Sequence, residues 1–467
     1  MSFLLSPAAP TGQPLTFLDE RPGERLLKQL IWLYMALLLF EGALRKWVLP
    51  MLSDPLLIVR DPVAIGIILV YLVNGYKFWN VYVTVIVATT LFSVITAIGW
   101  GHGSVPVAVF GARIYLFHFP LIFIIGEVFN RRDVEQVGRV LCWLIIPITV
   151  LVALQFYSPQ SAWVNRGVGG SLEGAGFSGA LGFFRPPGLF SFTNGNSLLY
   201  GFLACFVFYF WRERQKIGTF LLLAATLAMF ITIPLSISRA YLFQVVICFL
   251  FMAFASISDV RSFFTFSGML LLLPVLLLLA SQLGFVSTGL EAFEARFENA
   301  SRSEGGLEGT FTERFLGGFT RPLGYKEARP WTGYGIGMGT NVGSTLLTGE
   351  VSYLIDEGEV GRVIGEQGLT VGLINLLARV IFAIGLGFAA LRALFQQNAL
   401  PWMLLSYSLL TTVNSLWGQP TSLGFAVVSL GLTLAAFYET EVVDVADTLT
   451  EEDNYEAAYR PSLQPLN

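Results

Sequence analysis

The sequence predicts an all-α protein that crosses a membrane about twelve times and carries a large, partly helical loop outside it. Three observations support this fold class. Hydrophobic residues make up 54% of the 467 residues, and charged residues only 13%, whereas about a quarter of a soluble protein is charged. The hydrophobic residues gather in runs of roughly 20, the length that a spanning helix needs. One long polar stretch, residues 284–365, interrupts these runs.

The apolar runs define the expected spans, nine before the polar stretch and three after it. They lie at residues 28–48, 57–74, 80–100, 105–128, 137–156, 194–211, 217–236, 239–257, 263–283, 367–391, 400–417 and 421–438. This divides the chain into a lead-in (1–27), nine spans (28–283), a large loop (284–365), three spans (366–438) and a tail (439–467). The tail has eight acidic residues and one basic residue, which is typical of a disordered segment.

The distribution of Lys and Arg predicts the orientation, because cytoplasmic connections are enriched in both. With the N-terminus in the cytoplasm, the inner connections hold Lys77, Arg131, Arg132, Arg212, Arg214, Lys216, Arg261 and Arg392. The short outer connections then hold only Arg60, Arg166, Arg185 and Arg239. We therefore expect both termini in the cytoplasm, and residues 157–193 and 284–365 on the outer face.

The large loop has features of a folded cap that lies on the membrane. Phe311, Phe315 and Phe319 recur every four residues, which predicts a short amphipathic helix. Trp331 and Tyr334 are side chains that favour membrane interfaces. The glycine-rich run 333–339 does not follow a strand of a βαβ unit, so it does not predict a nucleotide loop. It is either an anion-binding nest or a plain flexible turn.

Arginines on the outer face are candidates for binding an anionic lipid head, because a guanidinium binds phosphate oxygens in a bidentate manner. The candidates are Arg185, Arg239, Arg314, Arg321 and Arg362, with Asn194 in the polar run that follows Arg185. The alternative is that each arginine extends to the interface or pairs with a nearby glutamate.

Charged residues inside the expected spans are costly and therefore informative. Glu41 and Arg45 stand four residues apart, so they are expected to form a structural ion pair. Arg113 and Arg379 have no obvious local partner. Each faces either the bundle interior or a lipid-phosphate site, and Arg113 is the better candidate for substrate binding. His118 is expected to be an interior histidine with satisfied hydrogen bonds.

The end of the large loop holds the candidate catalytic groups. On a helix, Arg362 lies three residues after Glu359 and four before Glu366, so the three side chains share one face. One carboxylate is a candidate general base while the guanidinium holds a phosphate. The alternative is a salt-bridged helix cap where the chain enters the membrane.

Several stretches resemble the superfamily of bacterial O-antigen ligases and Wzy-type polysaccharide polymerases. They are the run from Arg185 to Asn196, Ser238-Arg239, and Glu366-Gln367-Gly368-Leu369. The number of spans and the late loop are also similar. Residues 40–47 (FEGALRKW), with Arg60-Asp61-Pro62, resemble a branch of polymerase-like proteins.

The resemblance implies a bacterial inner-membrane glycosyltransferase that uses an undecaprenyl-pyrophosphate-linked glycan on the periplasmic face, without metal or cofactor. It implies that the candidate arginines grip the pyrophosphate. The ligases carry a histidine about nine residues before the closing glutamate, where this chain has Glu357. That departure makes a lipid A-core ligase less fitting and leaves Glu357 or Glu359 as the base.

Two other functions stay open on the sequence. The first alternative to a polymerase is a ligase that moves a glycan onto lipid or protein. The second is a non-enzymatic transporter of lipid-linked saccharide. The expected partners are the lipid-linked oligosaccharide, membrane lipids, and a chain-length regulator or other assembly proteins. No nucleic acid is expected.

Overall fold

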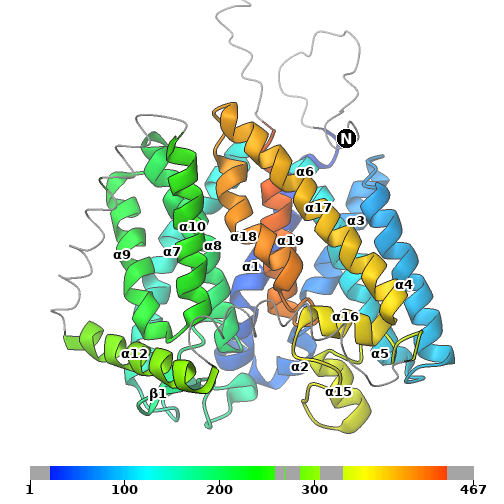
Figure 1. Cartoon of the computed structure of the whole chain (residues 1–467), viewed down its shortest axis with the longest axis horizontal. Helices are drawn as coiled ribbons and strands as arrows, with labels where there is room; N and C mark the ends of the chain where they lie inside the picture. Colours follow the sequence, from blue (N-terminus) through cyan, green and yellow to red (C-terminus); the bar gives the residue numbers. More distant parts are fainter. Residues whose placement is uncertain (1–20, 258–267, 269–283, 305–329, 439–467) are drawn as a thin grey trace, which may run out of the picture.

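The apolar runs fold as helices that pack side by side, as the computed structural model in Figure 1 shows. The structure describes residues 21–257, 268, 284–304 and 330–438. The described residues form helices and one short hairpin, so the all-α prediction is confirmed.

The first half of the chain supplies helices that are twice interrupted by π-helical turns. In order these elements are α1 (Glu24–Ala43), the π turn η2 (Leu44–Val48), η3 (Pro50–Leu52), α2 (Ser53–Leu56), α3 (Arg60–Val73), α4 (Val81–Gly99), α5 (Val105–Arg113), the π turn η4 (Ile114–His118), α6 (Phe119–Val128) and α7 (Arg131–Tyr157). The segment Pro50–Leu56 and α3 form one apolar pair that is bent by 43°.

Between α7 and α8 lie two short 3₁₀ turns, η5 (Trp163–Asn165) and η6 (Val168–Gly170), and an antiparallel hairpin. Its strands are β1 (Phe177–Ala180) and β2 (Phe183–Arg185), with Phe177 opposite Arg185. The remaining elements are α8 (Thr193–Arg212), η7 (Arg214–Lys216), α9 (Thr219–Ser236), α10 (Arg239–Ile257), α12 (Gly284–Glu304), α15 (Asn341–Thr348), α16 (Glu359–Gln367), α17 (Leu369–Phe395), α18 (Leu400–Asn414) and α19 (Pro420–Ala435).

Among the described residues, seven helices are long and apolar enough to cross a membrane, or eight if the bent pair counts as one span. The protein is therefore built as a membrane protein. Helices α8, α18 and α19 occupy three further expected spans, and α18 and α19 have only 15 and 16 residues. The expected span 263–283 lies outside the described residues except for Gly268. The total of twelve spans stays a prediction.

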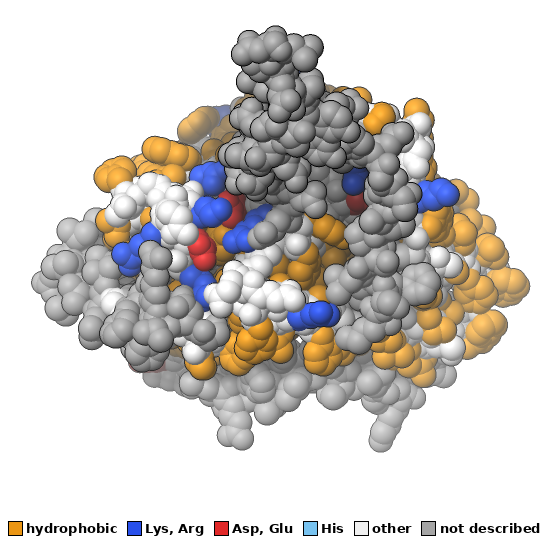
Figure 2. All heavy atoms as spheres, turned by 90° about the horizontal axis from the view of Figure 1, so that it is seen from above, with side chains coloured by type: hydrophobic (Ala, Val, Ile, Leu, Met, Phe, Trp, Pro, Cys, Tyr) orange, Lys and Arg blue, Asp and Glu red, His pale blue; other side chains and the backbone are white. Residues whose placement is uncertain are grey.

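The two ends of the helix bundle differ in what they carry (Figure 1). Helix α1 begins and α19 ends at the upper edge, whereas the hairpin, α12, α15 and α16 lie at the lower edge, which we call the loop end. Lys and Arg side chains gather on the upper face (Figure 2). The first and last of the described residues, Arg21 and Tyr438, therefore lie on one side, and the cytoplasmic location of the two termini stays a prediction.

The glycine run 333–339 is fixed against two helices. Gly337 has a φ of +93°. If Gly111 of α5 carried a Cβ atom, that atom would lie 2.4 Å from the backbone nitrogen of Gly337. The N–H of Tyr334 donates to the carbonyl of Gly365 at 2.8 Å. The His102 Nε2 atom lies 3.1 Å from the carbonyl oxygen of Ile336. The run is therefore a docked segment, not the flexible turn that the sequence favoured.

This close approach makes a prediction about Gly111. The change Gly111→Ala places a methyl group against the backbone of Gly337, so it should lower the free energy of unfolding by about 1–3 kcal/mol. Thermal unfolding in detergent measures the effect. The control is Gly66→Ala in α3, where a Cβ meets no atom within 4 Å and alanine is the better helix former. Equal stability of the two variants would contradict the docked position of the run.

Candidate functional site

A buried network of charges surrounds α16. Glu359 accepts from Arg362 at 2.9 Å, from Arg379 of α17 at 2.7 Å and from the backbone N–H of Trp417 at 3.0 Å. Glu366 accepts from Arg362 at 2.7 Å and from the N–H of Gly339 at 2.9 Å. Each of the four charged side chains is at most 2% exposed.

The electrostatics of this network fit a structural role. Burial raises the pKa of the Glu359 carboxyl, but Arg362 and Arg379 outweigh that effect and hold the pKa below its usual value. Burial also raises the pKa of Glu366, and there the opposing effect of Arg362 is the weaker one. Both oxygens of Glu359 already accept hydrogen bonds from buried donors. The geometry favours the salt-bridged cap over a general base at Glu359 or a phosphate-binding role for Arg362.

Two other residues of the predicted site have different outcomes. Glu357 is exposed just before α16 begins, so it is accessible to a substrate. Arg379 faces the bundle interior and pairs with Glu359; the two are 20 residues apart, too far for helix spacing to reveal. The predicted lipid-binding residues Arg314 and Arg321, and the expected helix at 309–319, lie outside the described residues.

The structure places Arg185 and Asn194 in a segment, residues 185–197, that contacts Ser238, the residue before Arg239. A Cβ on Gly179 would lie 3.5 Å from the Arg185 side chain and 2.7 Å from Ile237, two residues before Arg239. The hydroxyl of Ser197 donates to Ser238 at 2.9 Å. On another side, the amide of Asn194 donates to Ser422 at 3.2 Å. The segment 185–197 is therefore the junction of β2, α8, α10 and α19.

Three cations that were not among the predicted site residues lie against this segment or at the neighbouring start of α19, and Arg113, which was a predicted site residue, lies nearby. The Lys46 ammonium donates to the carbonyl of Gly188 at 2.8 Å, and Arg45 donates to the hydroxyl of Ser191 at 3.1 Å. Arg60, at the start of α3, donates to the carbonyl of Pro420 at 2.6 Å, where α19 begins. We call Arg45, Lys46, Arg60 and Arg113 the cationic cluster.

Two carboxylates lie within the cationic cluster. Glu41 contacts Arg60 at 3.2 Å and Arg45 at 3.6 Å, so the expected Glu41–Arg45 pair is present and Arg60 joins it. Asp61 contacts Arg113 at 2.7 Å, so Arg113 has a partner that lies 52 residues away in the chain.

Asp61 also contacts a histidine. It lies 3.0 Å from His118, whose other ring nitrogen lies 2.9 Å from the hydroxyl of Tyr34. His118 is thus a buried interior histidine with two partners, as expected.

The cluster keeps capacity for a further anion. Lys46 is fully buried, and no carboxylate in the described part of the chain pairs with it. Arg60 is 2% exposed, and its Nη1 atom has no hydrogen-bond partner. Thr193 and Asn196, in the first turn of α8, also hold buried polar side-chain atoms without partners. Such groups are expensive to bury, so a lysine without a carboxylate partner, next to buried polar atoms without hydrogen-bond partners, suggests an anionic ligand.

Local backbone features place these cations. Arg45 and Lys46 lie in the π turn Leu44–Val48, and Arg113 directly precedes the π turn Ile114–His118; such turns recur at functional sites. The bend between Pro50–Leu56 and α3 brings Arg60 inward. Gly424 of α19 leaves room for it, since a Cβ there would lie 2.1 Å from Arg60 Nη1. The charges within the run FEGALRKW were the sequence signal for this cluster.

Comparison with known proteins gives no match to a family model, a curated protein or a solved structure. The described residues contain no group of three or more His, Cys, Asp or Glu side chains that could hold a metal ion.

The α16 network predicts that Glu359 stabilises the fold. The change Glu359→Gln leaves Arg362 and Arg379 buried without their shared carboxylate, so it should cost about 3–5 kcal/mol of unfolding free energy. Thermal unfolding of the purified protein measures this cost. The exposed Glu357→Gln is the matched control and should unfold like the unaltered protein. A Glu359→Gln variant that is fully stable but inactive would restore Glu359 as the base.

Proposed function

We propose that the protein is a polysaccharide polymerase of the bacterial inner membrane, which transfers a glycan from an undecaprenyl-pyrophosphate-linked donor to an acceptor sugar hydroxyl on the periplasmic face. The observation that carries the proposal is the cationic cluster beside residues 185–197. It lies toward the loop end and includes Lys46, which has no carboxylate partner within the described residues.

The chemistry needs positive charge where the leaving group departs. The acceptor oxygen forms a bond to the anomeric carbon while the bond from that carbon to the pyrophosphate oxygen breaks. The pyrophosphate leaves with the electron pair, and Lys46 and Arg60 stabilise its added charge. The acceptor proton passes to a carboxylate. Glu357 is the better candidate, because the oxygens of Glu359 already accept from Arg362, Arg379 and Trp417.

The transporter alternative is the less favoured one. It would need charges that line a path through the bilayer, and of the candidate arginines only Arg113 and Arg379 lie well inside the expected spans. Arg379 is paired with Glu359, and Arg113 with Asp61. A ligase uses the same chemistry with a different acceptor, so a product assay has to separate it from a polymerase.

The proposal predicts that Lys46 is required for turnover. The change Lys46→Met keeps the length of the side chain and removes its charge, so it should lower the rate of transfer at least about 100-fold. The control is Lys77→Met, because Lys77 is exposed where α3 connects to α4. The assay incubates purified protein with a lipid-linked repeat unit and resolves products on a gel. Equal rates for both variants would contradict the role of the cluster.

The products of the same assay identify the reaction. A ladder of lengthening glycan supports the polymerase, and transfer only to an added lipid or protein acceptor supports the ligase. An unchanged donor, together with donor movement across vesicles, would overturn the proposal in favour of transport.

A further inference from the structure

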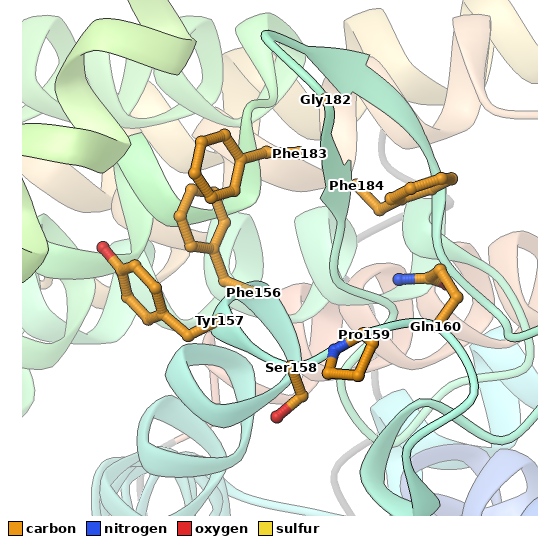
Figure 3. A pocket seen from close by; sticks show the side chains of 8 residues that line it. All are labelled: Phe156, Tyr157, Ser158, Pro159, Gln160, Gly182, Phe183 and Phe184. Carbon is orange, nitrogen blue, oxygen red and sulfur yellow. The ribbon is translucent and has the colours of Figure 1, made fainter.

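A pocket of about 220 Å³ opens at the end of α7, beside the hairpin. Phe156, Phe183 and Phe184 form its walls, and Pro159 and Gln160 line its floor (Figure 3). The rings of Phe156 and Phe183 stack at 4.6 Å with an angle of 5° between their planes, so they make one flat, rigid wall.

Gln160 gives the pocket a polar group with a defined orientation. Its Oε1 atom accepts from the backbone N–H of Gly176 at 3.0 Å, which identifies the other amide atom as Nε2. In Figure 3 this nitrogen points toward the space between the rings. Within the described residues, no hydrogen bond uses it as a donor. The pocket thus offers aromatic faces and one amide donor to a ligand.

The pocket is joined to the cationic cluster through two residues, Gln155 and Gly188. Gln155, one position before Phe156, accepts from the N–H of Gly188 at 2.8 Å and donates to its carbonyl at 3.1 Å. The same carbonyl accepts from Lys46 at 2.8 Å. A ligand with its phosphate at Lys46 therefore has the aromatic pocket beside it.

We propose that this pocket binds a sugar ring of the glycan that the protein transfers, an inference that rests on the proposed function. A pyranose has apolar C–H faces that pack on aromatic rings and hydroxyl groups that accept from an amide. Ligand pockets combine apolar walls with a few placed polar groups in this way. An acyl chain would leave the Gln160 donor without a partner.

Binding of free sugars tests the subsite without requiring turnover. The probes are methyl glycosides of common bacterial hexoses, 6-deoxyhexoses and N-acetylhexosamines, measured by saturation-transfer NMR on the full chain in nanodiscs. At least one glycoside should bind the unaltered protein. Gln160→Ala and Phe184→Ala should each weaken binding about five- to tenfold, whereas Phe184→Trp should keep it.

Two controls make the test specific. Phe220→Ala removes an aromatic ring that is 78% exposed at the start of α9, and Lys77→Met alters an exposed lysine between α3 and α4; both should bind the glycosides normally. Thermal unfolding confirms that each variant is folded. Absence of glycoside binding, or binding in both Gln160→Ala and Phe184→Ala that equals the binding of the unaltered protein, would overturn the subsite. Loss in Phe184→Ala alone would overturn it in favour of an apolar ligand.

The subsite and the proposed function fail in different ways. If glycosides bind through Gln160 and Phe184 but no lipid-linked donor is consumed, the subsite stands and the transferase proposal is wrong. If Gln160→Ala and Phe184→Ala both form the glycan ladder as fast as the unaltered protein, the transferase proposal stands and the pocket assignment is overturned.

Discussion

The structure depends on four buried cations toward the loop end of its helix bundle, which need anions or hydrogen-bond acceptors around them. Arg45, Lys46, Arg60 and Arg113 are all at least 92% buried, and Glu41 and Asp61 are the carboxylates in the described part of the chain that pair with them at short distance. Buried cations require anions or hydrogen-bond acceptors, because desolvation is expensive. The carbonyls of Gly188 and Pro420 supply part of that requirement. The remaining excess of positive charge is what we assign to a pyrophosphate.

A second network joins α16 to a segment that also contacts this cluster. Glu359 binds Arg379 of α17 and the backbone of Trp417, so it ties α16 to the bundle. The segment that carries Trp417 ends at Pro420, whose carbonyl binds Arg60. The two networks therefore share one short segment, 417–420. This connection places the exposed Glu357 on the same side of the bundle as the cationic cluster, which suits a carboxylate that must reach the acceptor.

The sequence predicts contacts between side chains that are three or four residues apart on the same helix. The spacing of Glu41 with Arg45, and of Arg362 with Glu359 and Glu366, anticipates real ion pairs. The spacing cannot show that Arg379 reaches Glu359, that Arg113 reaches Asp61, or that Lys46 reaches Gly188. These contacts depend on how separate helices pack, and on the π turns and bend that redirect them. For the same reason the docking of residues 333–339 on Gly111 was not foreseen.

The most direct test of the central claim is binding of a diphosphate lipid to the cationic cluster. Native mass spectrometry of the purified protein with farnesyl diphosphate and with farnesol compares two ligands that differ only in the charged head. The account predicts that the diphosphate binds, that farnesol does not compete, and that Lys46→Met removes the bound diphosphate. Equal occupancy by both lipids, or undiminished diphosphate binding in Lys46→Met, would contradict it.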